Sequence, residues 1–89
     1  MGFGAVTVGA IPTLILSDNP KRLSLIIING GTDVLHFAQD DTVSSSNSPY
    51  LLPNGNMTED SGGTKVYCGP FYGVSTGGTC SVYYWERER

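Results

Sequence analysis

The residues of this chain that could do chemistry are one histidine, a few loop carboxylates and two cysteines. Asp60-Ser61-Gly62-Gly63 matches part of the nucleophile segment of a serine protease, and His36 could serve as its base. Those enzymes use two barrels to hold nucleophile, base and orienting acid together, and 89 residues are too few to build them. A glycine-rich turn explains the segment better, because short motifs are weak outside their structural context. We therefore expect no catalytic residue and no enzyme.

Metal chemistry has equally little support in the sequence. Four acidic residues fall in segments that read as loops, and their oxygens could in principle bind Ca²⁺: Asp40, Asp41, Glu59 and Asp60. Their spacing does not resemble an EF-hand, and solvated loop tips account for them. A structural zinc site needs four ligands, and one histidine with two cysteines cannot complete the set. We expect no metal and no cofactor, and we read His36 as a half-buried, hydrogen-bonded strand residue.

Cys68 and Cys80 are the only cysteines in the chain. They could close a short disulfide loop across neighbouring strands, or they could be buried and reduced. The first residues, Met1 to Ala5, lack the basic start and long apolar core of a secretory signal, which indicates synthesis in a cytoplasm. A reducing compartment favours the second reading of the cysteines.

Charge and composition argue against two classes of partner. The formal net charge is −3, only 15% of the residues are charged, and no basic cluster is larger than Lys21-Arg22. A protein that follows phosphates needs several clustered cations, so we expect no nucleic-acid partner. The same balance disfavours anionic membranes, and no apolar run reaches the roughly 18 to 20 residues that span a bilayer.

The elements that must position these residues read as short strands, because glycine or proline interrupts nearly every window that could form a helix. Alternation predicts strands over residues 5–8, 13–17, 23–29, 33–39, 50–52, 64–68, 71–75 and 79–86. Gly30-Gly31 and Gly77-Gly78 are the expected hairpin turns, and residues 40–48 and 56–63 the expected loops. Seven or eight short strands at this spacing predict an all-β sandwich or small barrel that forms one domain over residues 1–89.

Two of the expected strands are apolar on both faces. With a side-chain period of two, Leu25 and Ile27 point one way while Ile26 and Ile28 point the other. The last strand repeats the pattern, with Tyr83 and Trp85 on the face opposite Cys80, Val82 and Tyr84. A second layer of the same domain or another subunit must cover the second face of each strand. We predict that Ile26, Ile28, Tyr83 and Trp85 form a subunit interface.

The order of the turns and strands resembles a known family. Asn19-Pro20-Lys21-Arg22 leads into the apolar strand that ends at Asn29, and a serine-rich loop, Leu52-Pro53-Asn54-Gly55 and Gly78-Thr79-Cys80-Ser81-Val82 follow. Over about residues 6–86 this pattern is similar to that of small virion proteins of tailed bacteriophages, of the capsid decoration (cement) or head-fibre type. The Cys68 and Cys80 pair and the Tyr83-Tyr84-Trp85 ending depart from that pattern and leave the subfamily open.

The resemblance implies a jelly-roll-like β-sandwich, often a homotrimer, that sits on the outer capsid surface and bridges subunits of the major capsid protein. It implies no catalysis, and it implies a virion protein made in the host cytoplasm. Within this reading, residues 1–9 are a possible N-terminal arm that contacts coat protein, and a tail or neck location is open. The alternative function is a carbohydrate- or receptor-binding module, with Tyr72, Tyr83 or Trp85 as its stacking surface.

Overall fold

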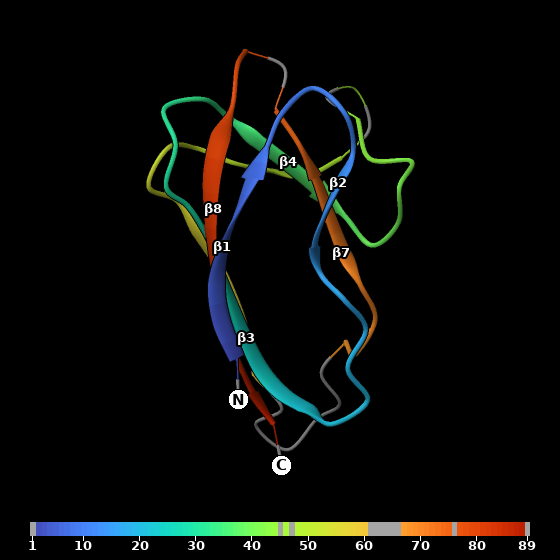
Figure 1. Ribbon diagram of the computed structural model, residues 1–89. Coiled ribbons are helices and arrows are strands. Elements are labelled where there is room, and N and C mark those ends of the chain that lie inside the picture. Colours follow the sequence, from blue (N-terminus) through green and yellow to red (C-terminus); the bar gives the residue numbers. More distant parts are fainter. Residues whose placement is uncertain (1, 45, 47, 61–66, 76, 89) are drawn as a thin grey trace.

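The structure, a computed structural model, describes residues 2–44, 46, 48–60, 67–75 and 77–88 (Figure 1). Its described residues form no helix and eight strands, which confirms the all-β fold class. The strands are β1 (Gly2–Val8), β2 (Thr13–Leu16), β3 (Arg22–Asn29), β4 (Leu35–Ala38), β5 (Tyr50–Leu51), β6 (Asn56–Asp60), β7 (Phe71–Val74) and β8 (Cys80–Glu88).

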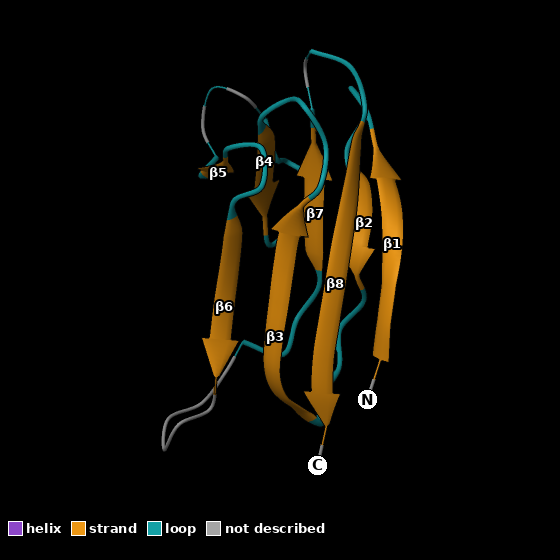
Figure 2. Ribbon diagram, turned by 90° about the vertical axis from the view of Figure 1, so that its left-hand side faces the viewer, coloured by secondary structure: helices purple, strands orange, loops and turns teal. Residues whose placement is uncertain are grey.

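The strands make two four-stranded antiparallel sheets. The first sheet has the order β1-β8-β3-β6 and the second the order β2-β7-β4-β5. Figure 2 shows the first sheet in front of the second, with β6, β3, β8 and β1 side by side. The pairs β1–β8, β2–β7, β3–β6 and β4–β5 are nested, as if one long hairpin had been wrapped into two layers. This is the strand order of a jelly roll, the architecture that the sequence resemblance implied.

The core lies between the two sheets and follows from alternation along the strands. Leu25 and Ile27 of β3 and Val82 of β8 point inward and are fully buried. The second sheet contributes Ile15, Leu16, Leu35 and Phe71, and Val8 and Cys80 complete the buried cluster from the first. Tyr84 and Met57 pack against its edge. The inner face of each two-faced strand is thus covered by the opposite sheet of the same domain.

Both glycine pairs were wrongly predicted to be hairpin turns. Gly30-Gly31 connects β3 of the first sheet to β4 of the second, and the loop containing Gly77-Gly78 connects β7 of the second to β8 of the first. The first crossing is fixed by Asn29, whose buried amide donates to the carbonyls of Asp33 (2.8 Å) and Leu51 (3.0 Å) and accepts from Gly31 N–H (3.0 Å). These bonds direct the chain across the end of the sandwich.

Two other segments differ from the sequence prediction. Residues 56–60 were expected to be a loop, but they form edge strand β6, paired with β3 from Ser24↔Asp60 to Ile28↔Asn56. The strand expected over residues 5–8, within the possible N-terminal arm, is confirmed and is longer than expected: β1 runs over Gly2–Val8 and pairs with β8 along its whole length. Of the strand expected over residues 64–68, only Tyr67 and Cys68 lie within the described residues, and they are not in a strand.

Candidate interaction surface

The four residues predicted to form an interface lie together on the outer face of the first sheet. Ile28 of β3 is directly opposite Tyr83 of β8, and Ile26 is directly opposite Trp85. Residues that pair directly across an antiparallel ladder point to the same side and touch. The opposite sheet covers none of the four, because it packs on the other side, against Leu25, Ile27 and Val82.

Strand β1 adds a fifth large side chain that sequence reasoning missed. Phe3 is opposite Trp85, and Ala5 is opposite Tyr83. Phe3 is the most exposed large apolar residue among those described, at 79%. Nothing local marks it, because its place depends on the register between the two ends of the chain. We call the outward set Phe3, Ile26, Ile28, Tyr83 and Trp85 the aromatic face.

The aromatic face is large enough to be a contact surface. Tyr83 is 49% exposed and Ile28 39%, whereas Ile26 and Trp85 are half-buried by their neighbours. With about 200 Å² for a fully exposed aromatic side chain, Phe3 and Tyr83 together present roughly 250 Å² of ring surface. The largest apolar patch on a typical monomer is about 300 to 600 Å² and is often functional. The two isoleucines and Trp85 bring the aromatic face into that range.

Polar side chains surround this apolar centre. Thr7 and Ser81 face each other at one end, and Thr58 of β6 flanks Ile26. At the other end, Arg87 donates from Nε to the Ser24 hydroxyl at 3.4 Å. An apolar centre inside a polar rim is the usual anatomy of a protein–protein contact.

The outer face of the second sheet carries a separate group of side chains. Tyr72 lies there opposite Leu14 and Ala38, on the far side of the sandwich from Tyr83 and Trp85. The three rings proposed as a stacking surface are therefore not one platform. His36 is half-buried on this side, its ring centroid 5.8 Å from that of Tyr50 and its Nδ1 3.5 Å from the carbonyl of Ser48.

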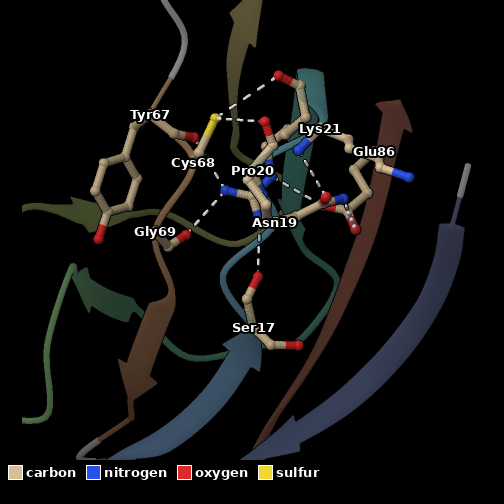
Figure 3. A network of polar contacts seen from close by, with 9 residues as sticks. Ser17, Asn19, Pro20, Lys21, Tyr67, Cys68, Gly69 and Glu86 are labelled. Carbon is tan, nitrogen blue, oxygen red and sulfur yellow. Dashed lines mark hydrogen bonds and ion pairs between the residues drawn. The ribbon is translucent and has the colours of Figure 1, made fainter. Parts of the chain in front are cut away.

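A buried arginine closes one end of the sandwich, and sequence reasoning counted it only as half of the basic pair Lys21-Arg22. A bulge between Arg22 and Ser24 turns the Arg22 side chain inward, where the residue is 2% exposed. Its guanidinium donates to Glu86 Oε2 (2.8 Å) and to the carbonyls of Tyr67 (3.0 Å), Gly69 (2.9 Å) and Ser17 (2.8 Å). These partners are drawn in Figure 3. Glu86 belongs to the first sheet, whereas Ser17 directly follows β2 and Tyr67 and Gly69 precede β7 of the second sheet, so Arg22 links the two layers.

The structure places Cys68 and Cys80 at opposite ends of the sandwich, with no disulfide between them. The Cys68 thiol lies 3.8 Å from the carbonyl of Arg22, where β3 begins. Cys80 is buried at the other end, its thiol 3.3 Å from the Asp33 carbonyl and 3.4 Å from the Ser75 hydroxyl. Cys68 thus lies where β3 begins, and Cys80 lies beyond the end of β3. An eight-residue strand such as β3 spans about 23 Å, whereas the Cα atoms joined by a disulfide lie within about 7 Å of each other.

The remaining sequence candidates are the loop carboxylates and the protease-like segment. Among the described residues there is no group of three or more His, Cys, Asp or Glu side chains that could hold a metal ion. The Asp40 carboxylate accepts bonds from the Thr42 hydroxyl and backbone N–H, which lower the pKa of that carboxyl. Residues 61–63 of the protease-like segment lie outside the described residues. No helix in the described part of the chain is long and apolar enough to span a membrane.

Comparisons of the chain with protein-family models, with curated proteins and with solved structures find no match. The aromatic face and the sequence resemblance are therefore the two observations that bear on function. The fold itself hosts many unrelated functions, so it cannot decide among them.

Proposed function

We propose that this chain is a non-enzymatic virion structural protein that decorates the outer capsid surface and assembles through its aromatic face. The observation that carries the proposal is the exposure of Phe3 and Tyr83 on a sheet whose other side is already closed by a complete core. A domain with a full core does not need these rings to fold. Large apolar side chains grouped on the surface are informative because isolated ones are common and grouped ones are not.

The proposed occupant of the aromatic face is a second and third copy of the same chain, in a homotrimer. A standard interface buries about 800 Å² on each partner. The aromatic face would supply the apolar centre of such an interface, and the rim of Thr7, Ser81, Thr58 and Arg87 would supply its polar margin. The aromatic face thus has the composition expected for the centre of such an interface.

The virion location is proposed from the sequence resemblance, with the jelly-roll order as support. Viral capsid domains are among the proteins that use this architecture. In the family that the sequence resembles, small β-sandwiches bridge subunits of the major capsid protein on the outside of the particle. We propose the same role here, with the polar loops contacting the coat.

The competing proposal is a carbohydrate- or receptor-binding module that stacks sugars on Tyr83 or Trp85. Sugar sites need polar groups around the stacking ring to fix orientation. The cross-strand neighbours of Tyr83 are instead Ala5 and Ile28, both apolar in side chain. This surrounding favours a protein contact.

Analytical ultracentrifugation of the wild-type chain and two tyrosine variants tests the proposal. Tyr83→Ser removes about 100 Å² of exposed ring from the aromatic face, whereas Tyr50→Ser removes a comparably exposed ring (59%) from the second sheet. At about 25 cal/mol per Å², Tyr83→Ser costs roughly 2.5 kcal/mol for each copy, or about a sixtyfold weaker association per copy. We expect a wild-type trimer at micromolar concentration, weaker association for Tyr83→Ser and no change for Tyr50→Ser.

A wild-type chain that stays monomeric at about 100 μM, or equal effects of the two variants, would contradict the trimer. A glycan array probed with the wild-type chain separates the competing function. Binding to glycans that is lost with Tyr83→Ser would favour the carbohydrate module instead.

A further inference from the structure

Strand β1 leaves one side of the first sheet open. It pairs with β8 on one side, and no described strand pairs with the other. Its seven residues, Gly2–Val8, include no charge and no proline. Native proteins normally protect such an edge with short strands, charges or proline, because its unpaired N–H and C=O groups can extend a sheet into another chain.

The other three sheet edges of the sandwich have the usual protection. The opposite edge of the first sheet, β6, has five residues and includes Glu59 and Asp60. The edges of the second sheet are β2, with four residues, and β5, with two. The longest edge strand is therefore the one that is left unprotected.

We infer that β1 pairs with β1 of a second copy of this chain, antiparallel, so that the first sheets of the two copies join into one eight-stranded sheet. The register that pairs all seven residues centres on Ala5, with Ala5 opposite Ala5 of the second copy and Phe3 opposite Thr7. An antiparallel pair of identical strands has two-fold symmetry, so each unpaired donor meets an acceptor of the other copy. Like charges directly opposite each other would oppose self-pairing, and β1 has none.

This register also joins the aromatic faces. Phe3, Ala5 and Thr7 are all exposed on the outer side of β1, and odd residues meet odd residues across the new ladder. The Phe3 rings of the two copies therefore stay on the same side of the joined sheet. The pairing is self-limiting, because it uses both β1 edges and leaves only the acidic β6 strands at the ends.

The two-fold contact is different from the trimer contact of the aromatic face and does not depend on it. One buries side chains on the surface of the sheet, whereas the other pairs backbone along its edge. A chain with both contacts can link trimers to one another, which suits a protein that covers a surface.

Disulfide trapping tests the edge contact. Directly opposite residues of an antiparallel pair have Cα atoms about 4.5 to 5.5 Å apart, within the range that a disulfide bridges. We introduce Ala5→Cys into the full chain with Cys68→Ser, and use Thr58→Cys in the same background as the control. Both sites are exposed, on the same outer face, and lie on the two opposite edge strands. We expect Ala5→Cys to form covalent dimers under mild oxidation at least tenfold faster than Thr58→Cys.

A charge exchange checks the same register without cysteine. Ala5→Lys and Ala5→Glu each place two like charges opposite each other, so each variant alone should lose the edge contact. An equimolar mixture places opposite charges there and should associate at least tenfold more tightly than either variant alone, as followed by sedimentation. The pair Thr58→Lys and Thr58→Glu should show no such recovery on mixing.

The outcomes separate the edge contact from the trimer. Trapping at Ala5→Cys that persists in a Tyr83→Ser background supports the edge contact, whatever the effect of Tyr83→Ser on the trimer. Equal trapping rates at the two sites, or no gain on mixing Ala5→Lys with Ala5→Glu, would overturn the inference.

Discussion

Replacing Arg22 with alanine should be among the most damaging single changes in this chain. The guanidinium is buried, and its removal leaves the carbonyls of Ser17, Tyr67 and Gly69 and the mostly buried carboxylate of Glu86 without their donor. Breaking a buried ion pair by deleting one partner costs about 3 to 5 kcal/mol. A domain of 89 residues has roughly 4 to 13 kcal/mol of stability, so Arg22→Ala removes a large part of it.

Urea unfolding followed by tryptophan fluorescence and by circular dichroism measures this cost. With an m value of about 1 kcal/mol per M, the unfolding midpoint should fall by about 3 to 5 M or the chain should be unfolded without urea. Arg22→Lys should be intermediate, since one ammonium cannot reach acceptors arranged around a planar fork.

Arg87→Ala is the matched control for Arg22→Ala. Arg87 is exposed and donates from Nε to Ser24 Oγ at 3.4 Å, so its loss should cost less than about 1 kcal/mol. If Arg22→Ala shifts the midpoint no more than Arg87→Ala does, the buried network does not hold the sheets together and the reasoning is refuted.

Two further predictions concern a close approach and a loop carboxyl. A Cβ at Gly31 would lie 2.7 Å from the Cα of Cys80, so Gly31→Ala should cost about 1 to 3 kcal/mol in urea unfolding, whereas Gly9→Ala, with its nearest atom at 3.8 Å, should change stability by less than about 0.5 kcal/mol. Equal losses of stability in the two variants would show that the backbone at Gly31 shifts to accommodate the added methyl group. The Asp40 carboxyl should titrate below its ordinary pKa of 3.8 in carboxyl-carbon NMR, and Thr42→Val should raise its midpoint. Because the folded-state pKa of Asp40 is lowered, its carboxylate stabilises the fold above the unfolded-state pKa, and this contribution is lost as the pH falls through the folded-state pKa. If the titration midpoint of Asp40 is unchanged in Thr42→Val, Thr42 is not the cause of the lowered pKa.

Strand positions could be predicted from the sequence because alternation is a local signal. Residues 23–29 and 79–86 were expected as strands, and the structure has β3 at Arg22–Asn29 and β8 at Cys80–Glu88. Strand β6 was missed because Asn56–Asp60 has only Met57 as an apolar side chain, and its pairing with β3 decides its conformation. A polar edge strand gives no alternation to detect.

Strand partners could not be predicted from the same signals. A glycine pair permits a tight hairpin and also permits a crossing between layers, so Gly30-Gly31 is compatible with both. The choice is made by contacts distant in sequence, such as the bond from the Asn29 amide to the Leu51 carbonyl. The burial of Arg22 was not predicted for a similar reason, since the bulge that turns it inward exists only in the pairing of β3 with β8.

The candidate site was predictable to the extent that it depends on period-two alternation. That period placed Ile26 with Ile28 on one side of their strand, and Tyr83 with Trp85 on one side of theirs. It could not predict that these two sides would belong to the same face of one sheet. The register of β3 with β8 makes them coincide, and the register of β1 with β8 adds Phe3. Each of these depends on residues far apart in the chain.

The apolar side chains on the two faces of β3 and β8 thus have different explanations. The inner face, with Leu25, Ile27 and Val82 fully buried, is required for folding. Tyr83 lies outside that core, so Tyr83→Ser should weaken association without lowering the stability of the separated monomer by more than about 0.5 kcal/mol. That outcome would assign folding and assembly to opposite sides of the same two strands.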